Sequence, residues 1–152
     1  MTATISLKDG VTDDEVRKAL EPFLDEHNLD FDEQVCVGNI EITDGKLCLH
    51  LDVFGDGGYA DNNLDELAER LAAVVDGWGW FEFVDDDLSG DSDAARTPYF
   101  IGLDENAQET ARLEYGIERM AEWVRPIIGD DAFEVVATQI VALPRVATET
   151  AK

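Results

Sequence analysis

An excess of acidic residues is the feature that most limits how this chain can fold. The sequence holds 35 Asp and Glu against 11 Lys and Arg in 152 residues, which gives a formal net charge of −24 at pH 7. A compact fold crowds these carboxylates on its surface, so it must tolerate their repulsion or exist in salt that screens it. The same surface repels nucleic acids and anionic membranes and attracts basic protein surfaces.

The rest of the composition indicates a packed domain in spite of this charge. Hydrophobic residues make up 45% of the chain, and three Trp, three Tyr and seven Phe are too many for a disordered acidic tail. We therefore expect one acidic α+β domain over residues 1–143 and a flexible tail over 144–152. The sequence shows no apolar run of the roughly 20 residues that a membrane helix needs, and its start does not follow the pattern of a signal peptide. These features, with only two cysteines, favour free thiols in a reducing cytoplasm.

The first residues predict a strand followed by a helix. Residues 3–7 alternate weakly in polarity, as a strand does. Thr12 and Glu15 have the spacing of a capping box, which predicts a helix start. Apolar residues then recur at helical spacing as far as position 24, with Pro22 inside the pattern. We interpret residues 25–33 as an acidic connection.

A β-hairpin over residues 35–54 is the clearest local prediction. Asp44-Gly45 is a strong two-residue turn signal. With this loop, Cys36 falls opposite Val53 and Cys48 opposite Glu41, so the two thiols point to opposite faces and no disulfide joins them. One face of the hairpin then holds only apolar residues and glycine: Cys36, Gly38, Ile40 and Ile42 opposite Val53, Leu51, Leu49 and Leu47.

The remaining two thirds of the chain continue the alternation of strands and helices. Turn residues and periodicity predict a flexible loop at 55–60 and a helix at 62–76. Two strands, at 80–84 and 98–103, then flank an acidic loop at 85–97. A long helix at 104–124, which Pro126 ends, precedes a last strand at 133–143 that is apolar on both faces and so central in the sheet.

The predicted order is therefore β-α-β-β-α-β-β-α-β. It corresponds to an α+β fold with about six strands in a single, mostly antiparallel sheet and three helices packed on one of its faces. The first two β-α-β units are partly ferredoxin-like in their alternation.

Cys48, His50 and Asp52 form the first candidate for chemistry. They lie two residues apart and so share one strand face, and their residue types bind zinc or form a Cys-His nucleophile. Neighbours on a strand face are about 6.5–7 Å apart, however, whereas zinc ligands converge within about 2.3 Å of one ion. We therefore favour a solvated hairpin face without a metal and keep these residues as weak metal candidates.

Two glycine-containing loops are partial matches to ligand-binding loops. The run from Asp85 to Asp93 places Asp and Ser as an EF-hand loop does, but Arg96 stands where a bidentate Glu is required. Gly55 to Gly58 lacks the Lys-Ser/Thr of a phosphate-binding loop and has acidic neighbours. We interpret both as ordinary connections and expect no cofactor.

The acids are concentrated in two stretches, Asp9–Glu33 and Asp56–Asp93, with net charges of −8 and −11. If both stretches share one side of the fold, they form a continuous negative surface. Tyr59 and Trp78 are possible aromatic anchors within it, with core packing as the alternative. The predicted partner-binding acids are Asp56, Asp61, Asp65, Glu66, Glu69, Asp85, Asp86, Asp87, Asp91 and Asp93.

We find no catalytic motif, so the leading hypothesis is a non-enzymatic binding protein. It predicts an inhibitor that occupies a basic, nucleic-acid-binding protein, such as a phage- or plasmid-encoded DNA mimic acting against a host defence system, without binding nucleic acid or membranes itself. One alternative is an immunity protein that neutralises a basic toxin nuclease. The other is a salt-adapted domain, such as a small enzyme using the Cys48 and His50 face, because the chain has 20 Asp but only 4 Lys.

Overall fold

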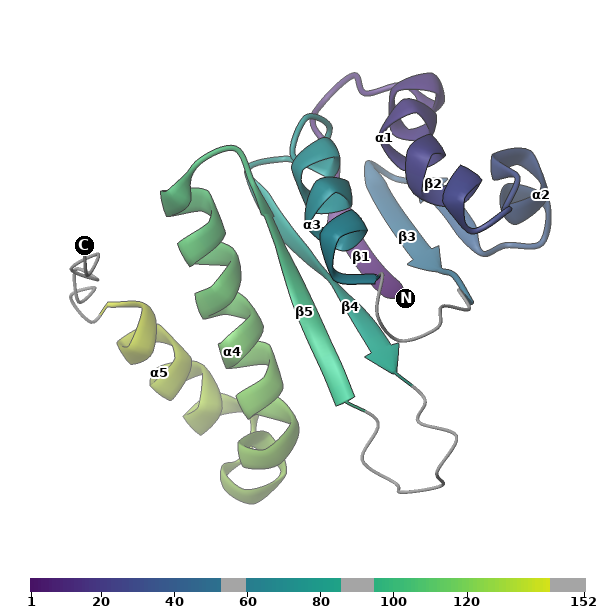
Figure 1. Ribbon diagram of the computed structural model, residues 1–152. Coiled ribbons are helices and arrows are strands. Elements are labelled where there is room, and N and C mark those ends of the chain that lie inside the picture. Colours follow the sequence, from purple (N-terminus) through teal and green to yellow (C-terminus); the bar gives the residue numbers. More distant parts are fainter. Residues whose placement is uncertain (53–59, 86–94, 143–152) are drawn as a thin grey trace, which may run out of the picture. The chain divides into compact units, whose positions relative to one another are not determined.

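The computed structural model describes residues 1–52, 60–85 and 95–142. The chain forms two compact units, Met1–Ala111 and Arg112–Lys152, and each is described by itself. Figure 1 shows the strands and helices of both. The predicted tail 144–152 and the predicted loop 55–60, apart from the backbone of Ala60, lie outside the described residues.

The first unit contains a five-stranded antiparallel sheet, which confirms the α+β class and the antiparallel sheet. Its spatial order is β2-β3-β1-β4-β5, so the described strands number one fewer than predicted. The strands are β1 (Thr2–Ser6), β2 (Ile40–Thr43), β3 (Lys46–His50), β4 (Trp78–Asp85) and β5 (Ala95–Gly102).

Helices α1 (Asp13–Glu26) and α3 (Ala60–Leu71) pack side by side on one face of this sheet (Figure 1). A short helix, α2 (Phe31–Cys36), lies between α1 and β2 in the chain. As far as β4, the strands and the two longer helices follow the β-α-β-β-α-β order of a ferredoxin-like motif. Strand β5 then adds an edge next to β4.

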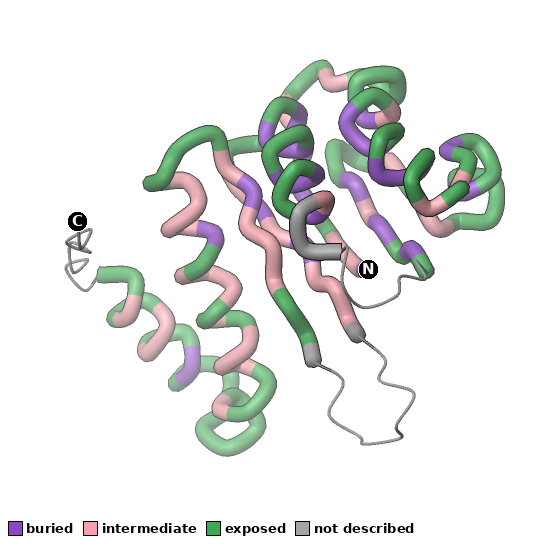
Figure 2. Tube along the Cα trace, in the orientation of Figure 1, coloured by how far each residue is buried: buried purple, intermediate pink, exposed green. Residues whose placement is uncertain are grey.

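The core lies between the sheet and these two helices. Alternate strand residues point into it, among them Ile5, Leu49 and Phe81, whereas Thr4 and His50 on the opposite sheet face are exposed. Leu20 of α1 and its helical neighbours complete the same cluster. In Figure 2 the buried positions of α1 and α3 follow one side of each helix, as their amphipathic spacing predicts.

The start of α1 is as the sequence predicts. The Thr12 side chain accepts a hydrogen bond from the Glu15 backbone N–H, and the Glu15 carboxylate accepts from the Thr12 N–H at 2.9 Å. Both halves of the capping box are therefore present. Pro22 lies inside the helix, which continues to Glu26, beyond the predicted start of the acidic connection.

The hairpin turn and its inner register are confirmed. Strands β2 and β3 pair Ile40 with Leu49 and Glu41 with Cys48. Asp44 and Gly45 have φ values of +52° and +71°, and positive φ at both turn residues is the requirement of a type I′ turn.

The outer part of the predicted hairpin is wrong, because residues 31–36 form α2 instead of a strand. The Asp30 side chain accepts the Glu33 N–H at 2.9 Å and caps this helix. Gly38, with φ of +80°, turns the chain out of the helix toward β2. Cys36 is thus a helical residue and not a strand residue, whereas Val53, its predicted partner, lies outside the described residues. Both cysteines are free, as predicted.

The C-terminal prediction is also wrong. The segment predicted as a central strand is α5 (Asp130–Val141), preceded by α4 (Glu105–Ile128). Gly129 begins α5 with φ of +84°, and Asp130 and Asp131 stand in its first turn, where the helix dipole favours them. Pro126 lies within the last turn of α4 and does not end it. The observed order is therefore β-α-α-β-β-α-β-β-α-α, with five helices in the described residues.

Candidate functional site

The outer side of α1 and α3 is an acidic surface. Because these helices are neighbours, acids from both acidic stretches of the sequence lie on one side of the first unit. We call this surface the acidic helix layer. Its exposed carboxylates belong to Asp13, Asp14, Glu15, Glu21, Asp25, Glu26, Asp65, Glu66 and Glu69.

Three bases on the same two helices only partly offset this charge. Arg70 pairs with Glu66 one helical turn away, at 2.5 Å, and Arg17 forms a two-pronged pair with Asp32 of α2. Lys18 is exposed on α1. Since Arg17 is directed to α2, most of the carboxylates of the layer are left to solvent and counterions.

Hydrogen bonding favours the charged form of two carboxyl groups: Glu15, which belongs to this layer, and Asp32 of α2. The guanidinium of Arg17 lowers the pKa of the Asp32 carboxyl below its ordinary value. Hydrogen bonds from the backbone and side chain of Thr12 lower the pKa of Glu15. Both groups are therefore ionised at neutral pH, as a negative surface requires.

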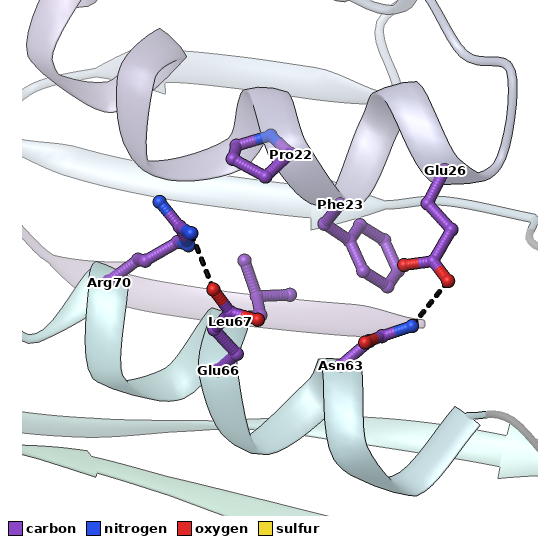
Figure 3. Close-up of a pocket in the computed structure, with 7 residues that line it drawn as sticks. All are labelled: Pro22, Phe23, Glu26, Asn63, Glu66, Leu67 and Arg70. Atoms are coloured by element: carbon purple, nitrogen blue, oxygen red, sulfur yellow. Dashed lines mark hydrogen bonds and ion pairs between the residues drawn. The ribbon is translucent and has the colours of Figure 1, made fainter.

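A small notch lies where the two helices meet (Figure 3). It has a volume of about 30 Å³, which is enough for one water molecule or an ammonium group. Phe23 and Leu67 supply its apolar floor, and Glu26 and Glu66 lie on either side. Asn63 donates to Glu26 at 2.5 Å. The notch thus combines apolar contact with carboxylates that can accept hydrogen bonds.

Only part of the predicted set of acids can be placed. Asp65, Glu66 and Glu69 are exposed on α3, next to α1. Asp61 belongs to α3 and Asp85 to β4, but their side chains are not described. The other predicted residues lie outside the described ranges: Asp56, Asp86, Asp87, Asp91, Asp93 and the aromatic Tyr59.

The candidate surface also includes acids of α1 that the predicted set left out. Glu21, Asp25 and Glu26 are exposed on this helix. Their spacing of four and five residues places them away from the buried stripe that contains Leu20 and Leu24. The amphipathic pattern of α1 was therefore sufficient to predict that these acids are exposed. The contact between α1 and α3 is a tertiary feature, which the pattern of one helix does not predict.

Trp78, the second predicted anchor, is a half-buried residue of β4. Its ring stacks on that of Trp80, with centroids 5.8 Å apart. Phe81, the next residue along the strand, points to the opposite sheet face, into the core, and is fully buried. Trp78 and Trp80 therefore lie on the sheet face opposite the acidic helix layer, so Trp78 is not an anchor within that layer.

The Cys48–His50 face shows no clustering of ligands. Cys48 is half-buried, and its neighbours across the sheet are Thr4 and Glu41. The exposed His50 pairs with Thr2. Asn39 lies across from His50, whose backbone N–H donates to the Asn39 carbonyl at 2.8 Å, and the Asn39 side chain donates to Gln34 at 2.8 Å. Within the described ranges, no three His, Cys, Asp or Glu residues are grouped so that they could hold a metal ion.

The second unit has a wide, open depression of about 570 Å³ between the end of α4 and the start of α5. Arg125 crosses it and pairs with Asp130 at 3.5 Å and Glu134 at 3.0 Å. Its guanidinium also lies over the Phe133 ring. These contacts hold the two helices together, so we interpret the depression as part of a structural joint.

Among the described residues, no helix combines the length and the apolar character needed to cross a membrane. Comparisons of the chain with models of protein families, with curated proteins and with solved structures found no match.

Proposed function

We propose that the protein is a non-enzymatic binding protein whose acidic helix layer docks on a basic protein surface. The observation that carries this proposal is the pairing of α1 with α3, which joins acids from two separate stretches of the chain on one side of the first unit. A single-signed surface of this kind raises the rate of encounter with an oppositely charged partner and rejects like-charged ones.

The notch between the helices suits one side chain of such a partner. A lysine can bring its ammonium group into the notch, against Phe23 and Leu67 and between the carboxylates of Glu26 and Glu66. This contact would supply a fixed point within an otherwise diffuse electrostatic interaction. Surface charges alone mainly affect the rate of association and its dependence on salt.

The partner that fits this chemistry best is a nucleic-acid-binding protein, whose basic groove already receives a row of anionic groups. In this role the chain acts as an inhibitor, such as a DNA mimic directed against a host defence system. An immunity protein for a basic toxin nuclease uses the same electrostatics with a single partner.

Salt adaptation is a second candidate function of the charge, and two observations favour it. The chain has few Lys and many Asp, and exposed acids also occur outside the acidic helix layer, for example Glu118 and Asp131. In that case the carboxylates serve solvation, and their position on the surface is of no consequence.

Two matched quadruple variants separate these candidates. The layer variant carries Glu21→Gln, Asp25→Asn, Asp65→Asn and Glu69→Gln. The control variant changes the same residue types elsewhere: Glu41→Gln, Asp52→Asn, Asp76→Asn and Glu118→Gln. All eight positions are exposed, and each variant lowers the magnitude of the net charge by the same amount.

Binding of both variants to a lysine oligomer of defined length is measured by titration calorimetry at several KCl concentrations. If the layer is the binding surface, we expect its variant to lose roughly tenfold or more in affinity and to show a shallower salt dependence, while the control stays within about threefold of wild type. Equal losses in both variants would contradict a localised surface and favour salt adaptation.

A further inference from the structure

Helix α4 presents large apolar side chains to solvent in the second unit. Trp123 is 76% exposed and Ile127 is 82% exposed. They lie one helical turn apart and so on the same face. Large aromatic and aliphatic side chains gathered in this way on a surface mark an interaction site more often than a single exposed residue does.

These two residues belong to a longer stripe. Gly116, Met120, Trp123 and Ile127 follow one another at intervals of four, three and four residues, which is the spacing of the seam in a pair of packed helices. Gly116 is exposed, and a side chain added there would meet no atom within 4 Å. The stripe is thus bulky at one end and open at the other. We call it the α4 seam.

The carboxylates of this part of α4 are turned away from the α4 seam. Glu114 and Glu118 lie about 120° or more around the helix from the residues of the α4 seam. Glu122 lies about 100° from Trp123, and its carboxylate is paired with Arg119 at 2.7 Å. Arg125, which is joined to Asp130 and Glu134 of α5, lies on that far side too. In a chain with a net charge of −24, the α4 seam is therefore a surface that another acidic molecule can approach without opposing carboxylates.

We propose that the α4 seam binds a second copy of this chain through an antiparallel, two-fold symmetric pairing of α4 helices. In this register Gly116 of one copy faces Ile127 of the other, and Met120 faces Trp123. The open end of each stripe then receives the bulky end of its partner, which is the self-complementarity that a two-fold interface requires. The α4 seam offers no carboxylate to a basic protein, so charge does not favour the basic partner of the acidic helix layer as its occupant.

The size of the surface predicts a reversible dimer. Trp123 and Ile127 together expose on the order of 300 Å² per copy, taking about 150–250 Å² for a fully exposed large side chain. A standard stable interface buries about 800 Å² per partner. We therefore expect association at concentrations of about 10–100 µM and above, where a weak interface becomes populated.

Salt distinguishes this interaction from the proposed binding of a basic partner. Two copies repel each other through their net charge, and this repulsion is screened as the Debye length falls from about 10 Å at 0.1 M to about 3 Å at 1 M. Dimerisation therefore strengthens with added KCl, whereas binding of a basic partner weakens. Failure of one proposal leaves the other standing.

Sedimentation equilibrium of the full chain from about 5 to 500 µM, at 0.1 M and 1 M KCl, tests the dimer over this range of screening. We expect the average mass to approach twice the monomer mass at high concentration and high salt. Trp123→Glu and Ile127→Glu should keep the chain monomeric. The control Val135→Glu, at a residue 58% exposed on α5, should dimerise as wild type does.

Gly116→Glu tests whether loss of dimerisation in a variant could result from loss of folding. This substitution fills the open end of the α4 seam but replaces glycine by a better helix former, so the monomer should keep its helical circular dichroism while losing dimerisation. A wild-type chain that stays monomeric under every condition overturns the proposal. A dimer that persists in the Trp123, Ile127 and Gly116 variants overturns it as well, because the interface then lies elsewhere.

Discussion

Arg17 shows how one base can serve structure within an acidic surface. Its guanidinium donates two hydrogen bonds to Asp32 and lies 4.5 Å from the centre of the Phe31 ring. Phe31 is buried, so these contacts attach α2 to α1. The pair also raises the pKa of Arg17, mainly through its hydrogen bond with Asp32.

This pair predicts a specific dependence of stability on pH. The pKa of Asp32 is lower in the folded chain than its ordinary value near 3.8, so its stabilising effect is present above that value and is lost as the pH falls through the lowered one. Asp32→Asn should therefore be less stable than wild type at pH 7 in urea denaturation at fixed KCl. The difference should shrink as the pH falls below 3.8 and vanish once the pH is below the lowered pKa of Asp32.

Acidification of the other carboxylates relieves repulsion in both chains alike, so the difference between the two is the quantity to compare. A gap that stays constant from pH 7 to the acid range would contradict the role of the Arg17–Asp32 pair.

Two glycines predict opposite effects of the same substitution. A side-chain carbon at Gly102 would lie 2.7 Å from the Ala107 Cβ and 2.8 Å from the Gln108 backbone nitrogen, too close for either to fit. Gly102→Ala should therefore lower the free energy of unfolding by about 1–3 kcal/mol. Gly116→Ala meets open space in a helix and should raise it by up to about 1 kcal/mol.

Urea denaturation at low protein concentration, where the chain is monomeric, checks both glycine variants. Similar changes in the two would mean that the approach of the start of α4 to the end of β5 is not as tight as described.

At the scale of elements, the cap of α1 offers a direct test. Thr12→Ala removes the side-chain acceptor for the Glu15 N–H and should cost about 1 kcal/mol of stability. Thr12→Ser keeps the acceptor and should stay close to wild type. Chemical denaturation of the two variants gives the comparison, and an equal loss in both would assign the effect to the lost methyl group.

The elements that the sequence predicted correctly are those with local signals. The capping box of α1 and the Asp44-Gly45 turn each specify their geometry within a few residues. The hairpin register from Ile40 to Leu49 then follows from the turn alone. The face that α1 buries was also predictable, because its apolar spacing does not depend on the rest of the fold.

The errors arose where two periodicities fit the same residues. Residues 133–141 are mostly apolar, with Glu134, Thr138 and Gln139 as the polar exceptions, so helix and strand patterns both match them. The acids at 130 and 131 were the signal for a helix start. Likewise, Asp30 and Glu33 have capping-box spacing, which indicated α2. The mostly apolar run 35–42 suggested one longer strand, whereas its first two residues end α2 and its last three belong to β2.

The candidate site was less accessible to sequence reasoning than the fold. The density of acids in each stretch is visible in the sequence, but the contact between α1 and α3 is set by packing on the sheet. The notch formed by Phe23 and Leu67 depends on the same contact. Spacing within one helix cannot reveal a surface that two distant helices share.

For the whole molecule, net charge predicts how stability responds to salt. A charge of −24 produces self-repulsion that KCl screens, so the melting temperature should rise as KCl increases from about 0.05 M to about 1 M and then level off, as the Debye length falls to about 3 Å. If the charge serves binding, the chain is already folded at 0.05 M. Thermal melts followed by circular dichroism measure this, and a chain that folds only in molar salt would favour salt adaptation.

Strand β5 has a further consequence as one edge of the five-stranded sheet. An edge strand eight residues long is a template on which other extended chains can add, which leads to aggregation. Pro98 interrupts the strand near its middle, and because proline has no N–H, the row of donors available to an incoming strand is broken there. The charged side chain of Arg96 stands two residues away on the same strand. Pro98 and Arg96 thereby make the edge a poor template for growth of the sheet, so we expect them to limit aggregation at this strand in addition to the negative charge of the chain.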